Sequence, residues 1–247
     1  MQNICNSIRP VYDSIKMEKS RTLRKAFTLV ELLTVVAVLA ILGSLLIAVI
    51  GGVKAKAHQA ACASNMRQIG FGLQLYANDH GEYPKANTTD LNESWIYTLS
   101  DYLEDLDEVR ICPVDPKADK RLKAGGTSYI LNSNVFAADQ TLDPFGNTVG
   151  KVYNRPSLIP NPAKTILAFN VSDSMPIGAT NDHTHSSDWT GWSSVLRDIQ
   201  PNRHGGREND LTSGSANYLY ADTHVESISA AAVKEKIVNG DNIAAVQ

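Results

Sequence analysis

One uncharged segment near the N-terminus constrains this chain more than any other feature of its sequence. No charged residue occurs between Glu31 and Lys54, and Leu32–Val53 is almost wholly apolar. A helix over this segment would be about 33 Å long, enough to cross a bilayer core of about 30 Å. Few helices of soluble proteins stay apolar on every face over such a length. The segment therefore predicts a single membrane span in preference to a buried core helix.

A basic segment precedes the apolar one. Residues 1–26 hold six Lys or Arg and two acids, or +4, which leaves 17 basic and 24 acidic residues, or −7, for the remainder. Positive charge beside a first span stays cytoplasmic, which predicts an extracytoplasmic C-terminal part. A secretory signal peptide would have a shorter apolar region followed by a small-residue cleavage site, whereas here that site comes first. The overall charge of −3 gives no indication of nucleic-acid binding.

The residues at the start of the apolar segment resemble a known processing site. The string RKAFTLVELL, residues 24–33, is similar to the cleavage motif of type IV prepilins and type II secretion pseudopilins. In that family a prepilin peptidase cuts after a small residue, usually Gly, and the new N-terminus is N-methylated. The resemblance implies cleavage between Ala26 and Phe27, methylation of Phe27, and a discarded leader at residues 1–26.

The same resemblance gives Glu31 a role as the fifth residue of the mature chain. An unpaired carboxylate beside hydrocarbon is unfavourable, so it either reaches the interface or finds a cationic partner. The family pairs this carboxylate with the amine of a neighbouring subunit, which sets the axial register between helices in a filament. The implied partners are further copies of the chain, other pseudopilins, the prepilin peptidase and an inner-membrane secretion platform.

The helical pattern continues beyond the apolar segment. Apolar residues recur at three- and four-residue intervals from Ala57 to Tyr76, and Asn78-Asp79-His80-Gly81 supplies a stop. We expect one helix over about Phe27–Asn78, transmembrane at 27–53 and amphipathic at 54–80. Residues 81–247 are predicted to form an extracytoplasmic domain.

The predicted fold class is α+β and pilin-like, with the long N-terminal helix packed on a small antiparallel sheet with long loops. Ser229 is expected to cap a final helix at Ala230–Val238. The loop predictions cover residues 137–163 and 172–216, which are rich in turn-forming residues. The predicted strands are Ser128–Phe136, Thr165–Val171, Asn217–Ala221 and Val225–Ile228.

Four patches of the domain resemble a pseudopilin branch with a C-terminal His–Asp-Gly signature. The resemblance assigns that signature to His204, Asp222 and His224. Here 17 residues separate His204 from Asp222 instead of the usual nine, and Thr223 replaces the Gly. The patches are Cys62–Gly70, Ile111–Pro116, Arg203–Gly206 and Ala216–Glu226.

The three cysteines fit this arrangement. Cys5 lies in the leader, which leaves Cys62 and Cys112 on the oxidising side of the membrane. A disulfide between them is predicted, with two buried free thiols as the alternative.

Metal binding and catalysis are further alternatives. Asp173, Asp182 and Asp188 lie where pseudopilins of the major type bind calcium, so calcium is an alternative to the predicted absence of a cofactor. The usual zinc spacings do not occur in the sequence, and His183 and His185 alone are a weak signal. No P-loop, Gly-x-Ser-x-Gly or His-Glu-x-x-His motif is found, so no enzyme activity is predicted.

The sequence thus predicts a pseudopilin subunit of a type II secretion-like system, anchored in the inner membrane and assembled into a periplasmic filament. Two alternatives stay open. One is a type IV pilin for adhesion, motility or DNA uptake, and the other is a membrane-anchored extracytoplasmic metal-binding or hydrolase domain.

Overall fold

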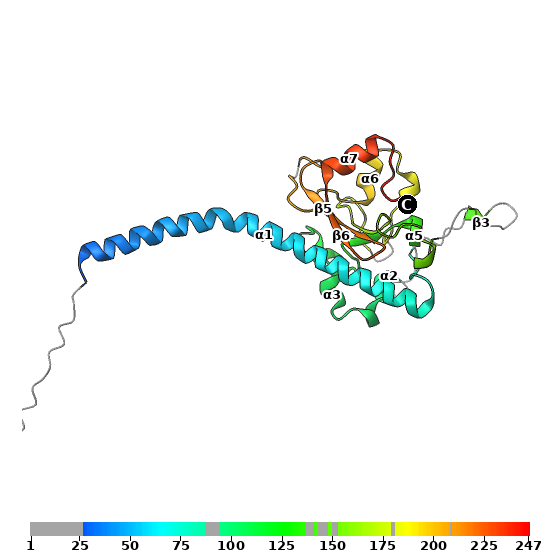
Figure 1. Cartoon of the computed structure of the whole chain (residues 1–247), viewed down its shortest axis with the longest axis horizontal. Helices are drawn as coiled ribbons and strands as arrows, with labels where there is room; N and C mark the ends of the chain where they lie inside the picture. The colour runs from blue at the N-terminus through cyan, green and yellow to red at the C-terminus, as the bar shows by residue number, and fades with distance from the viewer. Residues whose placement is uncertain are drawn as a thin grey trace, which may run out of the picture. The chain divides into compact units, whose positions relative to one another are not determined.

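The computed structural model describes residues 27–86, 94–136, 141–142, 148–149, 153–178, 181–207 and 209–247. The predicted leader at 1–26 lies outside these residues. The chain divides into two compact units between Ala48 and Val49, and each is described by itself below (Figure 1). The predicted domain boundaries at residues 26, 53 and 80 stay predictions.

Helix α1, Leu29–His80, is 52 residues long and confirms the predicted N-terminal helix with a shift of two residues. Thr28 lies at its N-cap, where the Thr28 Oγ1 accepts from the Glu31 backbone N–H at 3.2 Å. The Glu31 carboxylate accepts in return from the Thr28 backbone N–H at 2.9 Å. This reciprocal pair is a capping box, which satisfies two donors at the start of the helix.

The first unit contains the N-terminal part of α1, within the predicted transmembrane half at 27–53. The side chains of residues 45–50 lie outside the described residues. Within what is described, none of the helices combines the length and the hydropathy that crossing a membrane requires. The predicted span is therefore not confirmed.

The second unit is built on a four-stranded antiparallel sheet in the order β1-β4-β5-β6. Its strands are β1 Tyr129–Leu131, β4 Ile166–Asn170, β5 Ser215–Tyr220 and β6 Val225–Ser229. Strands β4, β5 and β6 confirm the predicted strands at Thr165–Val171, Asn217–Ala221 and Val225–Ile228. The α+β, pilin-like fold class is confirmed as well.

The sheet separates two apolar clusters, because successive side chains of a strand point to opposite faces. On one face the C-terminal part of α1 packs Met66, Ile69 and Leu73 against strand residues such as Leu219. On the other face Phe169 and Tyr218 pack with Val195 of α6 and Val233 of α7. Figure 1 shows the sheet lying between this part of α1 and the helices α6 and α7.

Helix α7, Ala230–Val238, confirms the predicted final helix, and the Ser229 hydroxyl accepts from the Ala232 N–H at 3.2 Å as its cap. The remaining elements are short. They are α2 Trp95–Thr98, η2 Ser100–Tyr102, α3 Leu106–Val109, α4 Ala118–Lys123, α5 Ser133–Phe136, β2 Thr141–Leu142, β3 Thr148–Val149, η3 Pro156–Leu158, η4 Ser186–Asp188 and α6 Trp192–Asp198.

Two predictions for this unit are wrong in part. The strand predicted at Ser128–Phe136 ends at Leu131 because Asn132 turns the chain: its side-chain oxygen accepts from the Asn134 N–H, and its carbonyl accepts from the Val135 and Phe136 N–H groups. The loops predicted at 137–163 and 172–216 contain regular elements, including the seven-residue helix α6. A helix of two turns is too short to produce a clear helical period.

Candidate functional site

The first turns of α1 expose apolar side chains on consecutive residues, and therefore on every side of the helix. Phe27 is 76 % exposed, Leu29 80 % and Leu33 65 %. A single apolar face would point to packing in a core, whereas apolar exposure all round requires an apolar surrounding or further copies of the helix. Ala26, the other half of the predicted processing site, lies outside the described residues.

The Glu31 carboxylate lies at the N-terminal end of this apolar surface. Its Oε2 accepts from the Thr28 backbone N–H at 2.9 Å and from the Thr28 hydroxyl at 2.8 Å. The capping box therefore fixes the carboxylate in the first turn, close in sequence to Phe27. A negative charge there also interacts favourably with the N-terminal end of the helix dipole.

A cluster of three buried side chains, Cys62, Cys112 and His204, lies in the second unit. Both cysteines are fully buried free thiols and His204 is 4 % exposed. One ligand atom from each residue can be chosen so that all three lie within 4.8 Å of one another. The Cys112 Sγ lies 4.0 Å from the His204 Nε2. The two cysteines of the predicted disulfide are thus neighbours, and the bond itself stays a prediction.

Hydrogen-bond donors surround the Cys62 sulfur. The Tyr129 hydroxyl donates to it at 3.5 Å and the Asn170 amide at 3.6 Å. The hydrogen bond from Cys112 lowers the pKa of the Cys62 thiol despite its burial, and His204 adds to the effect. The same contact and burial raise the pKa of Cys112. The pKa values of the two thiols are therefore shifted in opposite directions, and that of Cys62 is the lower.

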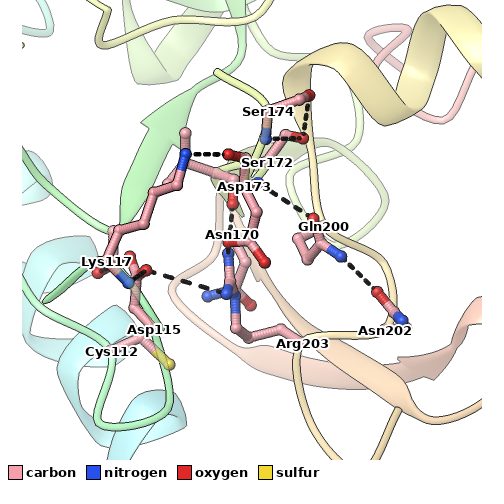
Figure 2. Close-up of polar contacts among 12 residues, drawn as sticks. Cys112, Asp115, Lys117, Asn170, Ser172, Asp173, Ser174, Gln200, Asn202 and Arg203 are labelled. Atoms are coloured by element: carbon pink, nitrogen blue, oxygen red, sulfur yellow. Dashed lines mark hydrogen bonds and ion pairs between the residues drawn. The ribbon is translucent and has the colours of Figure 1, made fainter. Parts of the chain in front are cut away.

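A buried ion network adjoins the cluster (Figure 2). Asp115, three residues after Cys112, accepts from the Arg121 Nε at 2.8 Å and from the Ser128 hydroxyl at 2.6 Å. Arg203, next to His204, has one terminal nitrogen 4.0 Å from the Asp115 carboxylate. The network thus connects the segment carrying Cys112 to the segment carrying His204.

The charge of Asp115 follows from these contacts. Burial alone would raise the pKa of its carboxyl, but the Ser128 hydrogen bond and the charges of Arg203 and Arg121 outweigh it, so the pKa lies below its usual value. Arg203 also pairs with Asp173 at 2.8 Å and donates to the Val171 carbonyl at 2.6 Å. Sequence reasoning missed this network, because the spacing of Asp115, Arg121 and Arg203 matches no known motif.

A cleft of about 520 Å³ opens beside Arg203. Polar contacts among its lining residues are visible in Figure 2: the Asp173 N–H donates to the Gln200 side-chain oxygen at 3.1 Å, and Gln200 donates to Asn202 at 2.6 Å. The Lys117 ammonium donates to the Asp173 carbonyl. Hydrogen bonds among these residues therefore hold part of the cleft wall in place.

The three residues of the predicted C-terminal signature do not all come together. His204 pairs through its backbone with Ser215, the first residue of β5, whereas Asp222 follows the other end of that strand. The strand between them, Ser215–Tyr220, alone is about 17 Å long. Asp222 instead contacts His224 within the β5–β6 turn, at 2.5 Å. His204 and Asp222 therefore lie at opposite ends of β5.

Each of the three aspartates of the predicted calcium site contacts a different side chain. Asp173 pairs with Arg203, Asp182 with His183 at 3.0 Å, and Asp188 accepts from the Ser187 hydroxyl at 3.3 Å. In the part of the chain that the structure describes, the side chains that gather closely enough to hold a metal ion are those of Cys62, Cys112 and His204. Calcium binding by these three residues stays a prediction.

Comparison with known families concerns the N-terminal segment. Residues 21–47 match the family model of the prokaryotic N-terminal methylation motif. The chain carries a pilin-type methylation motif. The matched range includes Ala26, Phe27 and Glu31, supports a type IV pilin or pseudopilin class of protein, and is typical of structural subunits. No curated protein and no solved structure matches the chain.

Proposed function

We propose that this chain is a filament-forming pseudopilin subunit of a type II secretion-like system. A prepilin peptidase would cut between Ala26 and Phe27, and Phe27 would then be N-methylated. The observation that carries the proposal is the methylation motif at residues 21–47. The exposed apolar surface at the start of α1 directly follows that cleavage point, which is where a subunit needs it for assembly.

The start of α1 anchors the subunit in the inner membrane and then packs in the filament. Before assembly its apolar side chains are surrounded by lipid, and afterwards by the helices of neighbouring subunits. In both surroundings these side chains are kept out of water, which is worth about 1.5–3 kcal/mol for each side chain of Leu or Val size. The basic leader stays cytoplasmic and residues 81–247 are extracytoplasmic, in keeping with the +4 charge of the leader and the −7 charge of the whole chain after it.

Glu31 sets the register between subunits. Its Thr28 contacts hold the carboxylate in the first turn, where the methylated amine of a neighbouring Phe27 can reach it. Two charges leaving water together are stabilised only if they pair closely, so a register that separates them is disfavoured. The work of the filament is mechanical: subunits added at the membrane platform, together with other pseudopilins, push secreted substrates outward.

Three variants of the capping box separate the charge of Glu31 from its role in the helix start. Glu31→Gln keeps a side chain that can complete the capping box and removes the charge. Thr28→Ala removes the cap and keeps the charge, and Glu31→Ala removes both. Filaments sheared from cells carrying the cognate secretion system are measured by immunoblotting, with the membrane fraction as the control for insertion.

We expect Glu31→Gln and Glu31→Ala to insert in the membrane and to yield few filaments, while Thr28→Ala assembles. Normal filaments from Glu31→Gln, combined with their loss in Thr28→Ala, would show that the carboxylate acts only as a helix cap. That result would refute the register proposal.

A further inference from the structure

We propose that Cys62, Cys112 and His204 bind one zinc ion. Two thiolates and an imidazole are the ligands that zinc takes in proteins, at about 2.3 Å for sulfur and about 2.0–2.1 Å for nitrogen. Tetrahedral ligands at those lengths lie about 3.6–3.8 Å apart. The 4.0 Å between the Cys112 Sγ and the His204 Nε2 is close to that spacing, and the three ligand atoms lie within 4.8 Å of one another.

The surroundings of the three side chains also favour a metal ion over a disulfide. The Cys62 Sγ accepts from the Tyr129 hydroxyl at 3.5 Å, a contact that leaves the sulfur free to bind a metal ion as well. A disulfide would use the two sulfurs alone and would leave a fully enclosed imidazole beside them without a role. A zinc ion uses all three side chains.

The backbone holds each ligand in place. Cys62 lies within α1, and Asn65, one turn later, donates to the Ile111 carbonyl at 3.0 Å, which fixes the segment carrying Cys112. His204 exchanges two backbone hydrogen bonds with Ser215, at 2.8 and 2.9 Å. Ligands on such fixed elements lose little conformational freedom when the metal binds.

Asn170 offers the fourth ligand that a closed structural zinc site requires. Its Oδ1 is buried and has no hydrogen-bond partner among the residues described, while its Nδ2 lies 3.6 Å from the Cys62 Sγ. Rotation of the amide exchanges the two atoms and brings the oxygen beside the sulfur. The same rotation would give an otherwise unpartnered oxygen a metal contact.

Zinc at this position would join four segments that are distant in the sequence: α1, the segment after α3, β4 and the segment before β5. Binding would displace the thiol proton of Cys112 and any proton on Cys62. Because a folded chain would bind the ion more tightly than an unfolded one, zinc would stabilise the second unit. This inference is independent of the proposed filament function, since every ligand lies in residues 49–247.

The test uses the full chain purified in detergent with Cys5→Ser as the background, reduced and without oxygen, then loaded with Zn²⁺ and exchanged into metal-free buffer. Elemental analysis is expected to give one zinc per chain. Competition with a chromophoric chelator should show binding weakened at least about 100-fold by Cys62→Ala, Cys112→Ala or His204→Gln. His204→Cys, which restores a ligand, should retain zinc, and so should His80→Gln, which changes an exposed histidine of α1.

Two further measurements use only the background protein, so a variant that misfolds does not affect them. Loading the background protein with Co²⁺ should give the thiolate-to-metal absorption of two sulfur ligands, and zinc should raise its Tm. The proposal is overturned if the loaded protein holds no more zinc than the double variant Cys62→Ala/Cys112→Ala. It is overturned as well if His204→Gln binds zinc as tightly as the background protein, or if the native protein is isolated with a Cys62–Cys112 disulfide and no zinc.

Discussion

Replacing Asp115 by Asn should destabilise the second unit strongly, because this carboxylate is the buried counter-charge of two arginines. Its side chain is 0 % exposed, and those of Arg121 and Arg203 are 2 % exposed. The Arg121 Nε lies 2.8 Å from one carboxylate oxygen and an Arg203 nitrogen lies 4.0 Å from the other. Asn has nearly the same size as Asp, so the substitution removes the charge with little change in packing.

The expected loss of stability follows from the buried arginine charge that stays without a partner. Removing one partner of a buried ion pair costs about 3–5 kcal/mol, because the other charge stays buried without compensation. Arg203 keeps its 2.8 Å contact with Asp173, so the loss falls mainly on Arg121, and we expect about 3 kcal/mol. For a unit of this size each kcal/mol changes Tm by about 2–4 °C, which gives a decrease of roughly 6–12 °C.

The pH dependence gives a second, independent signature. The pKa of Asp115 is lowered in the folded chain. The stability it contributes is therefore fully present above the unfolded pKa of about 3.9, and is lost as the pH falls through the folded pKa. The Tm difference between wild type and Asp115→Asn should be constant near neutral pH and should shrink below about pH 4.

Thermal unfolding of the full chain in detergent, followed by near-UV circular dichroism, measures both effects. Asp119→Asn in α4 is the matched control, because this exposed acid lies four residues away, and its loss should change stability by about 0.5–1 kcal/mol. A decrease for Asp115→Asn no larger than for Asp119→Asn, or a difference independent of pH down to pH 3, would refute this account of the network.

Two further substitutions test how the second unit is held together. Asn132→Leu should lower the free energy of unfolding by about 2–4 kcal/mol, measured by urea unfolding. The buried Asn132 amide donates to the Ile166 and Ala244 carbonyls at 2.7 and 2.8 Å, and both carbonyls would lose a partner. An unchanged urea midpoint would contradict this prediction. Ser229→Ala should cost about 1 kcal/mol in the same assay through loss of the α7 cap, whereas Ser187→Ala, at an exposed serine, should leave the midpoint unchanged.

The parts of the fold that the sequence predicted correctly are those with local signals. The start of α7 followed from a single serine before an alanine-rich segment, and β5 and β6 followed from β-branched and aromatic residues around a tight turn. The end of β1 did not, because Val135 and Phe136 favour a strand, whereas Asn132 turns the chain through its bond from the Asn134 N–H and is held by the Ile166 and Ala244 carbonyls. Local propensity is overridden by such contacts.

For the candidate sites too, the sequence predicted what has a local signal and missed what the fold brings together. Ala26, Phe27 and Glu31 lie within ten residues and carry a linear motif, so the sequence alone indicates the processing site. His204 is brought to Cys62 and Cys112 only by the fold, and its separation of 92 residues from Cys112 gives no spacing pattern. One signal was available: three of the four patches that resemble the pseudopilin branch each contain one member of the cluster.

The central claim is that this chain is processed as a prepilin, and the mass of its N-terminus tests it most directly. The protein is extracted from membranes of cells that contain the cognate prepilin peptidase, and its N-terminal peptide is sequenced by mass spectrometry. Our account predicts a chain that begins at Phe27 and carries one methyl group on its amine. An intact leader, or an N-terminus created by a cut after residue 50, would contradict it.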